Sequence, residues 1–263
     1  RSGTTWSQQQ KLVASTRINY DQFGGAVAIN GDTIVVGAKF YNNNISQKGA
    51  AYVFTRSGTT WSQQQLIQSS DIQASDQFGS NVDIAGNTIV VGALFEDAGG
   101  SNAGAAYVFT RSGTTWSQQQ KLVASDAATN DRFGSSSGIY GDTIVVGAVN
   151  ENSQAGSAYV FTRSNTTWSQ QQKIVGDASG YYDWFGIDVD IEEDTIVVGA
   201  YGDDSGTTQN GEGAAYIFTR SGTTWTQDKK IVSSTRSTNA YFGYNVAIQD
   251  NTVIVGAYGE SGS

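Results

Sequence analysis

The chain has 263 residues, a formal net charge of −9 and a sequence pI of about 4.4. It contains no Cys and no His, which excludes disulfides, a thiolate nucleophile, a Ser-His-Asp triad and the commonest metal ligand. The acidic balance and the lack of a long apolar run argue against nucleic-acid binding and membrane insertion.

One sequence unit recurs five times along the chain. Its opening segment, Arg-Ser-Gly-Thr-Thr-Trp or a close variant, begins at residues 1, 56, 111, 163 and 220. A period of about 55 residues, with several short strands in each unit, is typical of a propeller or a related repeat array. We therefore expect residues 1–263 to form a single domain built from these units.

Two strands are predicted at the start of a unit. In the first unit, Val27 and Ile29 alternate with alanines, which indicates a strand after the Phe-Gly pair at Phe23. Asn30-Gly31-Asp32 follows and is a strong signal for a tight hairpin. Residues 34–36 then predict a second strand, apolar on both faces, as expected where sheets stack on both sides.

Two further strands complete the unit. Residues 51–55 predict the third strand, and residues 56–58 the next turn. Residues 59–65 are polar and alternating, which suits a fourth strand at an outer edge facing water. Four antiparallel strands that run from buried to exposed make one propeller blade. The sequence thus predicts an all-β fold, a β-propeller of about five four-stranded blades.

The last unit is incomplete, and the first segment lacks a preceding blade. The fifth unit runs through its second strand, whereas residues 1–12 have the pattern of a fourth strand. That segment could complete the last blade of a ring, but one strand is still lacking between the two. We therefore expect the sequence to be part of a longer chain, or the chain to assemble with itself or another through an open blade edge.

Every unit carries a Phe-Gly pair followed, about a dozen residues later, by a Gly-Ala pair. The five sets resemble the FG-GAP repeat family, best known from the propellers of integrin α subunits, and are closest to its short-turn bacterial type. The resemblance implies a β-propeller that is usually extracellular and serves adhesion or ligand binding. The pairs begin at Phe23 and Gly37, Phe78 and Gly92, Phe133 and Gly147, Phe185 and Gly199, and Phe242 and Gly256.

Two departures from the integrin type matter. Integrin repeats often carry an Asp-rich calcium loop between the first two strands, whereas this chain has only a tight turn there, such as residues 30–32 or 85–87. The calcium sites of the family therefore do not carry over to these residues. Integrin propellers also have seven blades, while this chain supplies about five.

Residues that recur in every unit are expected to serve the scaffold. Glycine fits where a neighbouring backbone comes close, and a Trp on an outer strand covers the seam between blades more often than it stacks on a sugar. The expected structural residues are Phe23, Gly24, Phe78, Gly79, Phe133, Gly134, Phe185, Gly186, Phe242, Gly243, Trp6, Trp61, Trp116, Trp168 and Trp225. A carboxylate two residues before Phe-Gly, as at Asp21, Asp76, Asp131 and Asp183, should accept backbone N–H bonds in a turn, with metal binding as the alternative.

Strand order separates two kinds of loop. In a four-stranded blade, the 2–3 loops and the blade-to-blade connections lie on one face, and the two hairpin turns lie on the other. The 2–3 loops vary most, and we place more than half of the acidic residues but only a third of the basic ones on their face. Binding function usually lies on variable loops held by a rigid scaffold. These loops are residues 39–48, 94–103, 149–155 and 201–212.

The fourth unit departs most from the repeat and supplies the candidate ligand site. Its aromatic and acidic side chains suit a glycan, or a Ca²⁺ ion held by Asp203, Asp204 and Glu212, although no EF-hand spacing is present. We expect no other cofactor. The candidate ligand-binding residues are Asp177, Tyr181, Tyr182, Asp183, Trp184, Asp203, Asp204 and Glu212.

The sequence favours a non-enzymatic binding or adhesion module, secreted or at the cell surface. Its variable, acidic loop face would bind a protein or glycan ligand. The alternatives are a multivalent lectin with sites repeated between blades, and a structural subunit of an extracellular assembly. A glycosidase that uses two carboxylates stays open, but no unique pair stands out from the repeats.

Overall fold

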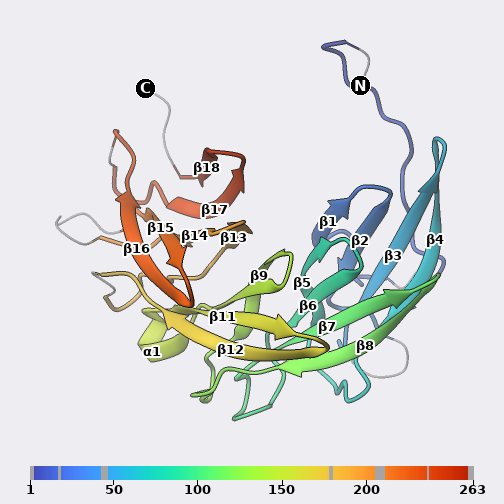
Figure 1. Ribbon diagram of the computed structural model, residues 1–263, viewed down its shortest axis with the longest axis horizontal. Coiled ribbons are helices and arrows are strands. Elements are labelled where there is room, and N and C mark those ends of the chain that lie inside the picture. Colours follow the sequence, from blue (N-terminus) through green and yellow to red (C-terminus); the bar gives the residue numbers. More distant parts are fainter. Residues whose placement is uncertain are drawn as a thin grey trace.

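The computed structural model describes residues 3–16, 19–42, 47–177, 180–204, 211–235 and 237–259. These residues fold into five antiparallel sheets arranged along an arc (Figure 1). Arg1 of the first motif and parts of two variable loops, residues 43–46 and 205–210, lie outside the described residues.

Each of the first four sheets contains four strands paired in chain order, and the fifth contains two. The first and second blades are β1 (Ala26–Asn30), β2 (Thr33–Ala38), β3 (Ala50–Ser57), β4 (Thr60–Ile67), β5 (Phe78–Ala85), β6 (Thr88–Ala93), β7 (Ala105–Ser112) and β8 (Thr115–Leu122). The third and fourth are β9 (Phe133–Tyr140), β10 (Thr143–Ala148), β11 (Ser157–Ser164), β12 (Thr167–Ile174), β13 (Val189–Glu192), β14 (Thr195–Ala200), β15 (Ala214–Ser221) and β16 (Thr224–Ile231). The fifth is β17 (Phe242–Gln249) and β18 (Thr252–Ala257), and the single helical element, α1 (Glu151–Gln154), is one irregular turn among the described residues.

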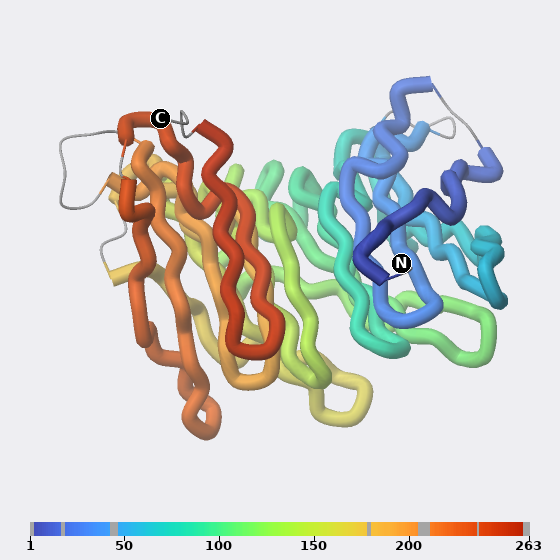
Figure 2. The backbone as a smooth tube through the Cα atoms, turned by 90° about the horizontal axis from the view of Figure 1, so that it is seen from above, coloured from blue at the N-terminus to red at the C-terminus, as the bar shows by residue number. Residues whose placement is uncertain are grey.

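The first strand of each sheet lies closest to the common axis. β1 contacts β5, β5 contacts β9, β9 contacts β13, and β13 contacts β17, whereas the outer strands β4, β8, β12 and β16 touch their neighbours far less. Figure 2 shows the first and fifth blades at the two ends of the arc. The sequence prediction of an all-β propeller with about five blades, the last incomplete, is confirmed.

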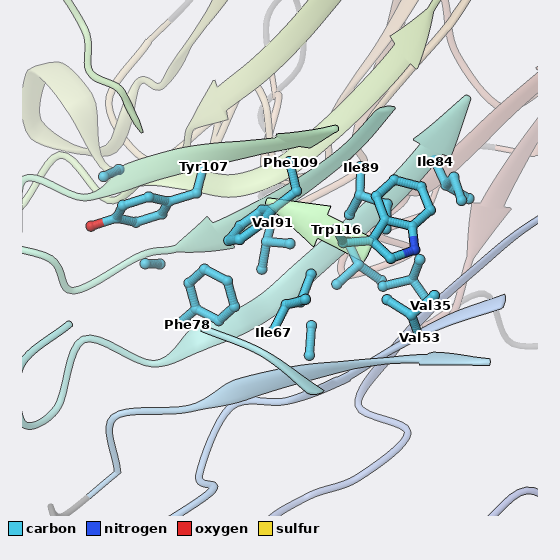
Figure 3. Packing of buried hydrophobic residues seen from close by; sticks show 14 residues of the cluster. Val35, Val53, Ile67, Phe78, Ile84, Ile89, Val91, Tyr107, Phe109 and Trp116 are labelled. Atoms are coloured by element: carbon cyan, nitrogen blue, oxygen red, sulfur yellow. The ribbon is translucent and has the colours of Figure 1, made fainter. Parts of the chain in front are cut away.

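Apolar side chains fill the seams between blades. Val35, Val53 and Ile67 of the first blade point toward Phe78, Ile84, Ile89 and Trp116 of the second, and all of them are almost fully buried (Figure 3). Similar clusters join the second blade to the third and the third to the fourth. Because each blade gives its two faces to two neighbours, its middle strands are apolar on both sides, which the sequence of residues 34–36 predicted.

The Phe-Gly pair serves the seam, as expected. Phe78 is buried and meets Phe109 edge to face, with ring centroids 5.9 Å apart. Gly79 has a φ of +87°, and a Cβ on it would lie 2.3 Å from the carbonyl oxygen of Ala50 in the preceding blade. Only glycine allows the two backbones to approach so closely.

The outer-strand Trp also covers the seam where a preceding blade is present. Trp116, Trp168 and Trp225 are each only 2% exposed and belong to the clusters between blades. The prediction fails at Trp6, whose side chain is 78% exposed. Trp6 lies before the first blade, in residues 3–16, which form no strand, so the prediction of a fourth strand over residues 1–12 is wrong for the part that the structure describes. Among the described residues, no blade lies before this segment to bury the Trp6 ring.

The two kinds of loop separate as strand order predicted. On one end of the propeller, hereafter the loop face, each 2–3 loop is bonded to a blade connection, as where the Phe95 N–H donates to the carbonyl of Asp76 at 3.3 Å. On the other end, the two hairpin turns of a blade meet. There the Arg56 Nε donates to an Asp32 carboxylate oxygen at 2.8 Å, and Arg163 pairs likewise with Asp142.

Candidate ligand-binding cavity

A cavity of about 500 Å³ opens on the loop face between the fourth and fifth blades. Its lining residues lie just beyond the ends of β14 and β18 and just before the start of β17. Its lining combines six aromatic rings with a carboxylate and an amide. The lining residues are Tyr181, Tyr182, Trp184, Tyr201, Gly202, Asp204, Gly211, Asn239, Tyr241 and Tyr258.

The scaffold fixes four of these side chains in place. Tyr201 directly follows β14, Tyr258 directly follows β18, and Tyr241 directly precedes β17. Trp184 directly precedes Phe185, whose ring is buried in the seam with the third blade. The cavity is therefore built on the rigid ends of the scaffold, which supports a preformed site.

The rings form two stacked pairs that meet at an angle. Trp184 stacks on Tyr201 with centroids 4.8 Å apart and planes 3° apart. Tyr241 stacks on Tyr258 at 4.9 Å and 16°. Tyr201 joins the pairs by meeting Tyr241 at 65°. Gly202 is needed beneath the first pair, because a Cβ there would lie 2.6 Å from the Trp184 ring.

The backbone under these rings belongs to the repeat rather than to the site. Trp184 has a left-handed φ of 52°, and Tyr241 has one of 55°. The matching residues Gln22, Gln77 and Arg132 have φ values of 55°, 56° and 57°. The conformation is thus a scaffold feature of every unit, and only the side chain it presents differs in the last two.

Half of the sequence-predicted site residues line the cavity: Tyr181, Tyr182, Trp184 and Asp204. Asp177 is exposed but lies outside the lining. Asp183, Asp203 and Glu212 are buried and do not line it either. The structure therefore brings the aromatic residues of the prediction together and separates most of the acidic ones from them.

Asp183 caps a turn. Its carboxylate accepts a hydrogen bond from the Gly180 N–H, and burial, with Asp203 and Asp204 nearby, raises its pKa to about 6. Asp76 accepts the Gln73 N–H at 2.7 Å, and Asp131 accepts the Ala128 N–H at 2.6 Å. Asp21 accepts the Phe23 N–H at 3.0 Å, so the expected bonding of these carboxylates to backbone N–H groups is confirmed for all four.

Asp203 is held in an ion pair. Its carboxylate accepts a hydrogen bond from the Tyr216 hydroxyl and lies 2.8 Å from the Lys230 Nζ. The matching acids of two earlier blades are also paired with a lysine, since Glu96 lies 2.6 Å from Lys121 and Glu151 lies 3.0 Å from Lys173.

The expected charge of the loop face needs a correction. Sequence reasoning left the three lysines at positions 121, 173 and 230 off this face, yet their side chains reach it from the outer strands. These lysines offset part of the acidic charge that the sequence assigns to the face, because a long lysine side chain carries its charge well beyond its own strand.

The calcium hypothesis gains no support from the carboxylates that the structure describes. Among these residues, no group of three acidic side chains is placed to hold a metal ion. Calcium binding by Asp203, Asp204 and Glu212 stays a prediction.

Sequence reasoning missed Tyr201, Asn239, Tyr241 and Tyr258. Unit-by-unit comparison carries the signal that would have found them. The position of Tyr201 and Tyr258 holds Lys39, Leu94 and Val149 in the first three units, and that of Trp184 and Tyr241 holds Gln22, Gln77 and Arg132. Aromatic residues replace unrelated ones at both positions only in the last two units.

Comparison with known families agrees with the repeat. The sequence pattern of the FG-GAP repeat matches residues 6–54, 61–109, 116–161, 168–218 and 225–263. The chain belongs to the FG-GAP repeat family. Each matched range of this FG-GAP chain starts at the Trp of the repeated motif, and the last four ranges each begin in the outer strand of a blade, at Trp61, Trp116, Trp168 or Trp225. No curated protein matches the chain by sequence.

The family accounts for the propeller and not for the cavity. The Phe-Gly and Gly-Ala pairs are shared by all five repeats, whereas the aromatic lining occurs where two repeats depart from the other three. In the part of the chain that the structure describes, no helix is long and apolar enough to span a bilayer.

Proposed function

We propose that this FG-GAP propeller is an extracellular, non-enzymatic binding module whose ligand occupies the aromatic cavity on the loop face. The observation that carries the proposal is the set of rings from two different blades, at positions where the first three repeats have other residues. FG-GAP repeats are typical of extracellular proteins, and they often serve adhesion or binding.

The exposure of the rings supports recognition. Tyr181 is 76% exposed, Tyr182 58% and Tyr258 65%. Large aromatic side chains gathered at the surface usually mark an interaction site, because they bury much area at little entropic cost when a ligand covers them. A cavity of about 500 Å³ is also within the range of small-molecule sites.

The chemistry around the cavity favours binding over catalysis. The chain has no His and no Cys. Asp183 and Asp203, two carboxylates near the cavity, are buried and bonded within the chain. The lining thus offers surfaces for contact rather than a matched acid and base.

The proposal is tested with Trp184→Gln/Tyr241→Gln, which installs the glutamine that the first two repeats carry at this position. Wild type and variant are compared by biolayer interferometry on a panel of immobilised extracellular glycoproteins and polysaccharides. We expect wild type to bind at least one panel member and the variant to bind it at least about tenfold more weakly.

The control is Tyr140→Gln, which removes a partly exposed tyrosine at a hairpin turn on the opposite end of the blades and should bind as wild type does. Equal binding by the double variant, or no binding of wild type to any panel member, would count against the proposal.

The number of aromatic cavities argues against the alternative function, a multivalent lectin. Among the described residues, this set of rings is found at one of the four places where blades meet. A multivalent lectin with sites repeated between blades would need similar linings elsewhere. We therefore favour one ligand site in each chain.

A structural role is the second candidate, and one observation favours it. On the outer face of the first blade, Val27 is 66% exposed and Ile29 63%, whereas their counterparts Val82 and Ile84 are buried against the preceding blade. Self-assembly that covers this face would give a mass that is a multiple of 27.9 kDa in light scattering. A monomer at all concentrations would contradict it.

A further inference from the structure

We infer that the aromatic cavity binds an uncharged sugar residue of a glycan and discriminates against the same sugar when it carries a carboxylate. The inference rests on the proposed binding function and names the ligand class of that site.

The lining matches the two-sided surface of a sugar ring. A pyranose has an apolar face of C–H groups and a rim of hydroxyls. Here aromatic rings supply the apolar surface, while the Asp204 carboxylate, the Asn239 amide and tyrosine hydroxyls supply polar contacts. The Tyr241 hydroxyl donates to Asn239 Oδ1 at 3.1 Å, which orients that amide at the edge of a ring. Such a mixture of apolar platform and fixed polar groups is what orients a polar ligand.

The same lining disfavours an anionic sugar. Among the residues that the structure describes, no lysine or arginine belongs to the lining, and Asp204 lies in it. Burial, with the carboxylates of Asp203 and Asp204 nearby, raises the pKa of Asp183, and the Lys230 Nζ near these acids lies 2.8 Å from Asp203. A carboxylate brought into the cavity would meet the like charge of Asp204 and no cationic side chain in the described lining, which is a direct source of discrimination.

A bare organic cation fits the geometry less well. Cages for quaternary ammonium groups present several ring faces to one point. In this cavity, Trp184 and Tyr201 use one face each on one another, and Tyr241 and Tyr258 do the same. The volume of about 500 Å³ also exceeds what a single ammonium group would fill.

The test uses sugars that differ only at C6. Gluco-, galacto- and manno-oligosaccharides are compared with the same sugars oxidised to uronic acids, by isothermal titration calorimetry on the whole chain. We expect at least one neutral sugar to bind, its uronic acid to bind at least about tenfold more weakly, and Trp184→Gln/Tyr241→Gln to lose the binding.

The carboxylate is tested with Asp204→Asn, which preserves shape and removes the charge. In this variant, the ratio of the dissociation constant of the uronic acid to that of the neutral sugar should fall by at least about threefold. Circular dichroism and thermal melting of each variant show that the fold is kept.

Failure of this inference is distinguishable from failure of the binding function. One such outcome is a glycoprotein that binds through the cavity with the same affinity before and after deglycosylation. The other is a set of uronic acids that bind as tightly as the neutral sugars. In either case the sugar inference is wrong while the binding function stands. Binding of choline that is lost in Trp184→Gln/Tyr241→Gln would assign the cavity to cations instead. If nothing in the panel binds, both are overturned.

Discussion

The side-chain amide of Gln65 pairs with the backbone of Trp116 in the next blade much as a neighbouring strand would. Its Nε2 donates to the Trp116 carbonyl at 2.8 Å, and its Oε1 accepts the Trp116 N–H at 2.8 Å. Gln64 accepts the Trp116 indole N–H at 2.9 Å. The same bonds join Gln120 to Trp168, Gln172 to Trp225 and Gln10 to Trp61. Outer strands lie too far apart for a shared backbone ladder, and the glutamine side chain spans the distance.

We expect Gln65→Ala to lower the free energy of unfolding by about 1–3 kcal/mol, because it leaves two partly buried backbone groups of Trp116 without their partner. Urea denaturation followed by Trp fluorescence measures the change. Gln10→Ala is the matched control, since it removes the same bonds at an exposed site and should cost less than about 1 kcal/mol. Equal losses in the two variants would contradict the buried role of the Gln65 pair.

Gly79→Ala should destabilise the chain by about 2–5 kcal/mol, from a strained left-handed residue and a clash with the Ala50 carbonyl. The comparison is Gly86→Ala, which has a φ of +57° but open space around its Cβ, and which should cost only about 1 kcal/mol. Thermal melting of both variants separates the two effects. The close approach of the blades would be in doubt if the two variants melted together.

The fold was predictable because its determinants are local and repeated. Alternation at Val27 and Ile29, the hairpin signal at residues 30–32 and the apolar run at 34–36 each specify one element within a few residues. Antiparallel strand order then fixes which turns lie together, so the loop face followed without knowledge of any long-range contact.

The cavity was only half predictable because its residues meet through the seam between blades. Trp184 and Tyr201 belong to the fourth blade, and Tyr241 and Tyr258 to the fifth. The sequence indicates that these four residues are special only when the five units are aligned with one another. Most of the acidic residues predicted for the site do not line the cavity, because three of them are buried within the chain. Asp203 and Asp204 are adjacent in sequence, yet one is held by Lys230 and the other lines the cavity, a difference set by a lysine on an outer strand.

The contribution of the Lys121 ion pairs to stability can be tested with the residues that the first blade has at the same positions. Lys121 lies 2.8 Å from Asp71 and 2.6 Å from the buried Glu96. Lys121→Leu should cost about 2–4 kcal/mol, because Glu96 loses its cationic partner in a buried place. The first blade has Leu66 and Tyr41 at these two positions. Adding Glu96→Tyr should therefore restore at least half of the loss in urea denaturation, and a further loss instead would show that the positions are not interchangeable.

We expect the buried Asp83 to make the stability of the chain depend on pH near neutrality. One carboxylate oxygen accepts the Ile84 N–H and the other accepts the Ile139 N–H of the next inner strand, both at 2.8 Å. Burial, with Asp190 and Asp188 nearby, raises the Asp83 pKa from 3.8 to about 7. The folded chain thus binds a proton that the unfolded chain releases between these two values, so stability should fall as the pH rises from about 5 to about 7.5, by about 1–3 kcal/mol.

Asp83→Ala, which installs the residue found at Ala28 and Ala247, should flatten this slope when urea midpoints are measured across the range. Burial likewise raises the pKa of Asp188 to about 6 and that of Asp190, so the slope should shrink without vanishing. Asp142→Ala, at an exposed hairpin turn, should keep the slope of wild type. A slope that Asp83→Ala leaves unchanged would mean that the carboxylate at the centre of the propeller does not titrate in this range.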